Sequence, residues 1–110
     1  MIEAVEIVVA RDFSTHPLGR QKDIFPFSGE RFREEFLEAP LKEGRSVRVD
    51  LRGTRGLAPS FLEEAFGGLI DAGLSWSTLA HHLTYVADDT ATESRITQYI
   101  RRAAGLSPTT

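Results

Sequence analysis

Cysteine is absent from the sequence, so disulfides, cysteine nucleophiles and thiolate metal sites are excluded. Long apolar runs are absent too, since none approaches the roughly 20 residues that a helix needs to cross a bilayer. The first residues, IEAVEIVVA, carry glutamates where a secretory leader would carry basic side chains. We therefore expect a cytoplasmic protein that has no membrane partner.

Positive charge is not in excess either. The formal net charge at pH 7 is -3, whereas binding to nucleic acid needs a concentrated basic face, so we expect no nucleic-acid partner. The P-loop pattern GxxxxGKS/T and the dinucleotide pattern GxGxxG are both missing, so no common nucleotide-binding signature is present. The 110 residues suffice for one layered core. We expect one domain over residues 1–106 and a fraying tail at residues 107–110.

Apolar residues at every second position predict strands. In the central run, Val47, Val49 and Leu51 alternate with charged residues, as in a strand with one buried face. The predicted strands lie at residues 4–10, 47–51 and 83–86, with a short strand near residues 24–27. The rest of the long connection before residue 28 is expected to be irregular.

Helix signals lie between the predicted strands. The predicted starts are Ser28, Ser60 and Thr90. The predicted ends are Gly73 and Gly105, and Pro40 is expected to kink or end the helix that starts at Ser28. Ser60 and Thr90 are each followed by a glutamate three residues later, which is the capping-box spacing. Because strands and helices alternate, we expect an α/β fold in which helices pack on a parallel or mixed sheet.

The central motif is SFLEEAFGGL, from Ser60 to Leu69, which follows the strand VRVDL and a loop rich in arginine and glycine. This arrangement resembles the STAS-like domains related to bacterial anti-sigma factor antagonists. It is most similar to a branch of unknown function, which also carries a Gly-Arg loop and a Ser-Gly-Glu-x-Phe helix, here Gly19, Arg20 and residues 28–32. The resemblance extends over about residues 5–106.

The resemblance implies a non-catalytic regulatory module. In the related antagonists, a serine at the start of the helix is phosphorylated by a partner kinase of the histidine-kinase-like ATPase fold, and Ser60 matches that position. Ala58, Pro59 and Phe61 stand where the family has Asp, Ser and Gly. The implied partner is a histidine-kinase-like ATPase or an anti-sigma factor. The implied contact residues are Arg52, Arg55, Leu57, Phe61 and Glu64.

Each of these residues also has a purely structural interpretation. Ser60 serves equally well as a helix N-cap, a role worth about 1 kcal/mol. Arg52 and Arg55 are either a contact surface for an acidic partner or a nucleotide phosphate, or two solvated side chains in a turn. The sequence leaves both alternatives open.

A second candidate site lies in the long connection. Its basic residues precede a predicted helix start, and helix N-termini attract anions. The candidate anion-binding residues are Arg11, His16, Arg20 and Ser28. The alternative functions are therefore a small-ligand or nucleotide sensor that uses this connection and, ranked last, a phosphate-processing enzyme using His16 with Arg20; a solvated loop is the structural alternative.

Histidine-based chemistry has little support. His81 and His82 are adjacent and therefore point in different directions on a helix or a strand, so they do not form a metal-ligand pair. No nucleophile, base and orienting residue come together in the sequence. We expect no metal, no cofactor and no catalysis.

Overall fold

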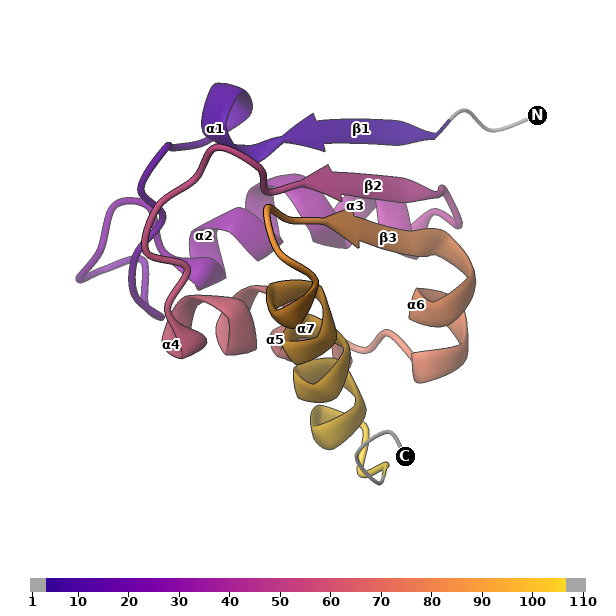
Figure 1. Cartoon of the computed structure of the whole chain (residues 1–110). Coiled ribbons are helices and arrows are strands. Elements are labelled where there is room, and N and C mark those ends of the chain that lie inside the picture. Colours follow the sequence, from indigo (N-terminus) through magenta and orange to yellow (C-terminus); the bar gives the residue numbers. More distant parts are fainter. Residues whose placement is uncertain (1–3, 107–110) are drawn as a thin grey trace.

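The structure is a computed structural model that describes residues 4–106. Three strands, β1 (Val5–Val8), β2 (Val47–Asp50) and β3 (Leu83–Val86), form a parallel sheet in the order β1-β2-β3. Figure 1 shows the strands side by side, with α2, α4, α5, α6 and α7 below them. The predicted α/β fold with a parallel sheet is confirmed. The predicted tail at residues 107–110 lies outside the described residues.

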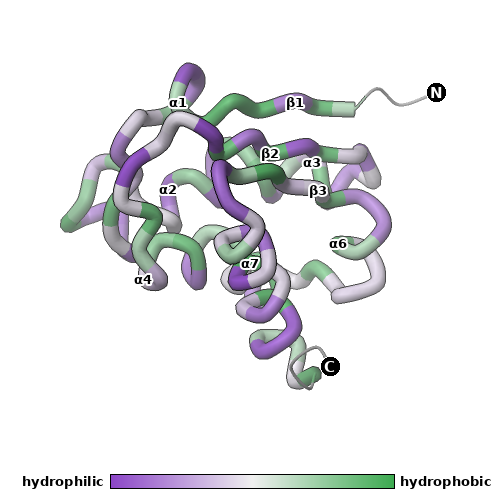
Figure 2. The backbone as a smooth tube through the Cα atoms, viewed as in Figure 1, coloured by the Kyte–Doolittle hydropathy of each residue, from purple (hydrophilic) through white to green (hydrophobic). Residues whose placement is uncertain are grey.

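One face of the sheet carries the core. Val47 and Val49 of β2 are buried, whereas Arg48 between them is exposed. The register places Val47 beside Val5 and Leu83, so apolar side chains line up across all three strands. Figure 2 shows this hydrophobic character along the strands and in α4. The opposite face carries the exposed Glu6, Arg48 and Thr84, which is unusual for a parallel sheet, since such sheets are normally covered on both faces.

The β1–β2 connection contains a helix that is widened by a π turn. Its segments are α2 (Gly29–Phe32), η1 (Arg33–Leu37) and α3 (Glu38–Lys42), and they follow the short α1 (Val9–Asp12). In η1 the Glu38 N–H donates to the Arg33 carbonyl, five residues earlier. Of the two predicted effects of Pro40, an end of the helix is not observed, since α3 continues to Lys42, and the departure from α-helical geometry lies ahead of it, in η1. Because proline has no N–H, one backbone hydrogen bond is absent here in any case, so the wider turn ahead of Pro40 costs few further hydrogen bonds.

The β2–β3 connection has the same design. Its segments are α4 (Pro59–Leu62), η2 (Glu63–Gly67), α5 (Gly68–Asp71) and α6 (Trp76–His82), and α7 (Thr90–Ala103) follows β3. Gly73 and Gly105 have φ angles of 104° and 75°, which confirms them as helix ends. Helix α6 was not predicted, because its residues lie next to the apolar run of β3.

Several predicted boundaries are corrected. The first strand ends at Val8 and not at residue 10, because Val9 begins α1. Residues 24–27 form turns and no strand. The N-cap of α7 is Asp89 and not Thr90, since the Asp89 carboxylate accepts the Thr92 N–H.

The central motif is explained mainly by packing. Phe61, Leu62, Ala65, Phe66 and Leu69 are all fully buried. Gly29 of α2 lies against this helix so closely that a Cβ there would be 2.6 Å from the Phe61 carbonyl. Gly68 similarly leaves room for the Arg33 side chain. The motif is therefore a packing signature for this fold.

The free edge of β1 is partly closed by its own chain. The Asp12 carboxylate accepts the Val8 N–H at 2.8 Å and also pairs with Arg11 at 2.8 Å. These hydrogen bonds lower the pKa of Asp12, with the bond from Arg11 the largest cause. A backbone donor at the sheet edge is thereby occupied.

Candidate functional site

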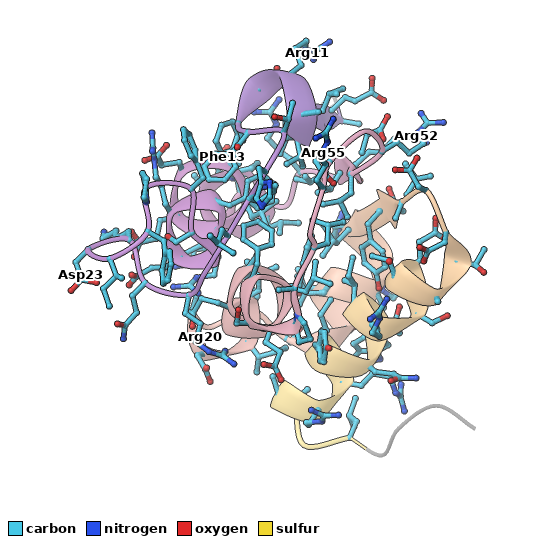
Figure 3. All side chains as sticks on the ribbon, turned by 60° about the vertical axis from the view of Figure 1, so that its left-hand side comes forward. Arg11, Phe13, Arg20, Asp23, Arg52 and Arg55 are labelled. Atoms are coloured by element: carbon cyan, nitrogen blue, oxygen red, sulfur yellow. The ribbon has the colours of Figure 1, made fainter. Side chains whose placement is uncertain are left out.

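The loops that follow the three strands meet at the carboxyl end of the parallel sheet, where ligands of α/β folds commonly bind. These are residues 13–28, residues 52–58 and residues 87–89. The first two lie side by side, since the Arg55 N–H donates to the Thr15 carbonyl at 2.8 Å. Figure 3 shows this side of the molecule turned forward.

The loop between β2 and α4 is held in one shape. The Thr54 hydroxyl donates to the Leu51 carbonyl at 2.6 Å, and the Gly53 N–H donates to the Asp88 carboxylate at 3.1 Å. Gly53 and Gly56 have φ angles of 83° and 63°, a backbone region that favours glycine. The exposed side chains of this loop are therefore carried on a fixed backbone.

Arg52 and Arg55 both lie on this loop and are exposed. The Arg52 guanidinium donates to both carboxylate oxygens of Asp50, at 3.0 and 2.8 Å. This side-chain hydrogen bonding lowers the pKa of Asp50 to about 2. Arg55 projects from the loop where it meets residues 15–16. Leu57 is half-buried and packs against the core.

Ser60 is not the N-cap of the helix. The helix begins at Pro59, and the N-cap is Ala58, which has no side-chain hydrogen bond to offer. Ser60 therefore occupies the first turn and is partly exposed. The predicted capping box between Ser60 and Glu63 is therefore not formed. The Glu63 carboxylate pairs with Arg20 and Arg102 instead.

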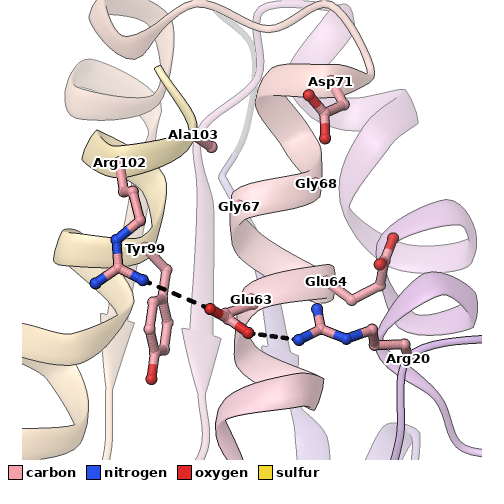
Figure 4. Close-up of a pocket in the computed structure, with 9 residues that line it drawn as sticks. All are labelled: Arg20, Glu63, Glu64, Gly67, Gly68, Asp71, Tyr99, Arg102 and Ala103. Atoms are coloured by element: carbon pink, nitrogen blue, oxygen red, sulfur yellow. Dashed lines mark hydrogen bonds and ion pairs between the residues drawn. The ribbon is translucent and has the colours of Figure 1, made fainter. Parts of the chain in front are cut away.

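Glu63 joins two arginines from distant parts of the chain. Its carboxylate lies 2.6 Å from Arg20 and 3.7 Å from Arg102. The segments α4, η2 and α5 together form what we call the central helix. Figure 4 shows this arrangement around a hollow of about 270 Å³ between α7 and the central helix. The arginine of the predicted Gly-Arg loop is thus tied to the central motif.

Two predicted contact residues are placed differently. Phe61 is fully buried, so it cannot itself contact a partner. The Glu64 carboxylate accepts from Arg33 at 2.6 Å, and the Glu64 carbonyl accepts from the same guanidinium at 2.7 Å. Arg33 also bonds to Glu38 at 2.8 Å. Burial would lower the pKa of Arg33, but its hydrogen bonds to Glu64 and Glu38 outweigh burial and raise it.

The predicted anion site at Ser28 is contradicted by the structure. Ser28 is fully buried, and its hydroxyl accepts the Arg31 N–H as the N-cap of α2. The two amides before Arg31 donate to the carbonyls of Gly19 and Arg20 at 2.8 and 3.0 Å. The first amides of this helix are therefore already occupied by the chain.

The predicted basic members of that site are also separated. Arg11 pairs with Asp12, and Arg20 pairs with Glu63. His16 is exposed and lies beside Gly56, where a Cβ would be 3.4 Å from its Nε2. The structure does not bring these side chains together around one point.

A second hollow, of about 240 Å³, lies between residues 54–57, residues 87–89 and the first turns of α7. Arg95 and Thr92 line its α7 side.

Within residues 4–106, no three His, Asp or Glu side chains are grouped so as to hold a metal ion. His81 bonds to the Ser77 carbonyl within α6. None of the helices in the described part of the chain has the length and apolar character needed to span a bilayer.

Sequence reasoning missed the arginine network. Arg33 is buried between Glu38 and Glu64, but their spacing along the chain gives no pairing signal. The Glu63–Arg20 pair also joins residues that are far apart in sequence. The only sequence signal for the Arg33 pairs is an arginine on an otherwise apolar helix face, and Arg20, which lies in a loop, gives none.

A family model described as "STAS-like domain of unknown function (DUF4325)" matches residues 28–91. This match includes both π turns, β2, β3 and the whole central motif. No curated protein and no solved structure matches the chain.

Proposed function

The chain belongs to the family of STAS-like domains of unknown function, and from this premise we propose that it is a non-catalytic regulatory module that binds a partner protein. The docking surface is the β2–α4 loop with the first turn of α4. Its exposed residues are Arg52 and Arg55, and Leu57 and Ser60 are half-buried. By family resemblance, the partner is a histidine-kinase-like ATPase or an anti-sigma factor.

The observation that carries this proposal is the fixed backbone of the β2–α4 loop. Hydrogen bonds from Gly53, Thr54 and Arg55 attach it to three different parts of the chain. A preformed loop loses little conformational entropy when a partner binds. It is also exposed at the end of the sheet, so a partner can reach it without rearranging the core.

Ser60 is the switch residue of the proposal. A phosphate on its hydroxyl would lie in the first turn of a helix, where the dipole favours negative charge. Glu63 and Glu64 would repel the phosphate, but both already pair with arginines. Their charge is therefore partly compensated, and phosphorylation would change the docking surface without breaking the fold.

The test compares tagged protein isolated from its native cells as wild type, Ser60→Ala, Ser60→Asp and Arg55→Glu. Intact mass reports phosphorylation, and the co-isolated proteins report the partner. We expect a phosphate on Ser60, and an ATPase-fold partner that Ser60→Ala retains while Ser60→Asp and Arg55→Glu lose it. Arg48→Glu, on the polar face of the sheet, is the matched control and should retain the partner.

An unmodified protein with the same partners in every variant would contradict the proposal. Loss of the partner in Arg48→Glu as well would show that reversing a charge away from the β2–α4 loop also removes the partner, so Arg55→Glu would not locate the docking surface. If Ser60→Asp retains the partner and Arg55→Glu loses it, the loop is a docking surface but Ser60 is not a switch.

A small-ligand sensor is the second candidate function. It is favoured by the hollow of about 240 Å³ at the carboxyl end of the sheet, where Arg95 provides a cation. Titration with ATP, GTP and inorganic phosphate, followed by thermal unfolding, tests it. A rise in the unfolding temperature that Arg95→Ala abolishes would support the sensor, and no shift with any of them would exclude these ligands.

A further inference from the structure

Ser60 lies on the same face of the central helix as two glutamates. Residues three and four positions apart in a helix are neighbours on its surface, so Ser60 lies one turn before Glu63 and Glu64. This turn is helical, since the Glu63 N–H donates to the Pro59 and Ser60 carbonyls. Ser60 is half-buried, and no hydrogen bond within residues 4–106 uses its hydroxyl. A group attached to this hydroxyl would therefore lie beside two carboxylates and their arginine partners.

The arginine that pairs with Glu64 is firmly held. Arg33 donates to the carboxylate and the carbonyl of Glu64 at 2.6 and 2.7 Å, and to the Glu38 carboxylate at 2.8 Å. Its side chain is only 11% exposed. Moving the guanidinium away would leave the Glu64 carbonyl and two carboxylates without this donor, which is costly at a largely buried position. Arg33 is therefore not available to a new anion at Ser60.

The arginine that pairs with Glu63 is held much less firmly. Arg20 donates to the Glu63 carboxylate at 2.6 Å, and within the described part of the chain its guanidinium makes no other hydrogen bond. The Arg20 side chain is 48% exposed and that of Glu63 is 32% exposed. Exposed ion pairs of this kind contribute little to stability. Arg20 can therefore change its partner at small cost.

The backbone that carries Arg20 is fixed close to Ser60. Arg20 follows Gly19, whose carbonyl accepts the Gly29 N–H at 2.8 Å. Gly29 in turn lies so close to the central helix that a Cβ there would be 2.6 Å from the Phe61 carbonyl. The residue that follows Ser60 is thus in contact with the segment to which the Arg20 backbone is attached. An exchange of partners by Arg20 needs only its side chain to move.

Glu63 has a second arginine within reach. Arg102 of α7 lies 3.7 Å from the Glu63 carboxylate, and its side chain is 69% exposed. Figure 4 shows Arg20 and Arg102 on opposite sides of Glu63, at the hollow between α7 and the central helix. The departure of Arg20 would therefore not leave Glu63 without a cation.

We propose that Arg20 binds the phosphate when Ser60 is phosphorylated, and that it leaves Glu63 to do so. The inference rests on the proposed function, since it needs a phosphate on Ser60. In that step the Ser60 Oγ bonds to the γ-phosphorus of ATP, the bond from this phosphorus to ADP breaks, and the hydroxyl proton is released. The phosphate carries a charge of about -1.5 to -2 at pH 7, so it attracts a guanidinium more strongly than a carboxylate does.

The exchange carries the state of Ser60 to α7. Before phosphorylation, Glu63 joins the loop that carries Arg20 to the last turn of α7. Afterwards Arg20 is bound to the phosphate, and Arg102 is the arginine that remains with Glu63. A partner that contacts this side of the central helix then meets a different arrangement of charges on the same backbone.

The test uses the full chain with phosphoserine incorporated at position 60 during synthesis, so that no kinase is needed. A phosphorus NMR titration measures the second pKa of the phosphate, which is ordinarily about 6. The Nε–H signals of the arginine side chains report which guanidinium binds it. Arg20→Gln is compared with Arg55→Gln, which removes a cation of the β2–α4 loop. Arg48→Gln is the matched control, since Arg48 pairs with Glu6 and is 49% exposed.

We expect Arg20→Gln to raise the second pKa of the phosphate by at least about 0.5, because an adjacent cation favours the dianion. Arg48→Gln and Arg55→Gln should raise it by much less. The Nε–H signal of Arg20, identified by its absence in Arg20→Gln, should shift between the unmodified and the phosphorylated protein. The signal of Arg48 should stay in place.

A phosphate pKa that Arg20→Gln leaves unchanged, or that Arg48→Gln raises equally, would overturn the inference. So would a pKa that Arg55→Gln alone raises, because the β2–α4 loop would then hold the phosphate. Failure of the proposed function is distinguished by the protein from native cells. If Ser60 is phosphorylated there and Arg20→Gln has no effect on the phosphate, the proposed function stands and the inference fails. If Ser60 is unmodified there, the switch fails even where Arg20 binds the incorporated phosphoserine.

Discussion

Arg33 is the residue on which the interior depends most. It is 9% exposed and connects carboxylates from two helices with a backbone carbonyl freed by the π turn. We expect Arg33→Leu to reduce the free energy of unfolding by about 3–5 kcal/mol, because it leaves the Glu64 carboxylate and carbonyl without their donor and leaves Glu38 with only the ammonium of Lys42, at 3.5 Å. Urea unfolding measures this. The control Arg48→Leu removes only an exposed pair with Glu6 and should change stability by less than about 1 kcal/mol.

Asp50 predicts a pH dependence. Its pKa is lowered from 3.8 to about 2 in the folded state, so the folded state binds its proton less readily than the unfolded state. The contribution to stability is therefore complete above about pH 4 and is lost as the pH falls toward about 2. We expect the difference in stability between wild type and Asp50→Asn to shrink over this interval. A difference that stays constant from pH 5 to about pH 2 would contradict the assigned cause.

The start of the central helix shows what residue patterns can and cannot predict. Ser60 with Glu63 has the capping-box spacing, yet Ala58 is the N-cap. The preceding Pro59 was the better signal, because its fixed φ and missing N–H suit the first helical position. The partners of Glu63 could not be predicted, since Arg20 and Arg102 reach it only through the folded chain.

At the scale of elements, close helix packing depends on Gly29. A Cβ at this position would lie 2.6 Å from the Phe61 carbonyl and 2.9 Å from the Ala65 nitrogen. Both are backbone atoms of the central helix and cannot move aside. We expect Gly29→Ala to cost about 1–3 kcal/mol or more by overpacking, measured by chemical unfolding. Gly67→Ala is the control: its Cβ would lie 3.4 Å from the nearest atom, so a cost as large as that of Gly29→Ala would refute this explanation.

The regular elements were predictable and the irregular ones were not. Alternation of apolar residues located β2 and β3, and Ser28 was correctly predicted as an N-cap. The π turns η1 and η2 left no local signal, because they are set by packing between the two helices and by Arg33. The end of β1 at Val8 also depends on a long-range choice, since Val9 is buried in α1 rather than in the sheet.

The Asp12 carboxylate at the edge of β1 has a consequence for solubility. A parallel sheet with an open edge can template the next chain through its unused backbone donors, which is how sheets polymerise. Here the donor of Val8 is occupied by a negatively charged group, so an approaching strand meets a carboxylate where it needs an amide. The short helix α1 thus occupies one backbone donor at the β1 edge, so a further strand that pairs along this edge would lose the hydrogen bond to Val8.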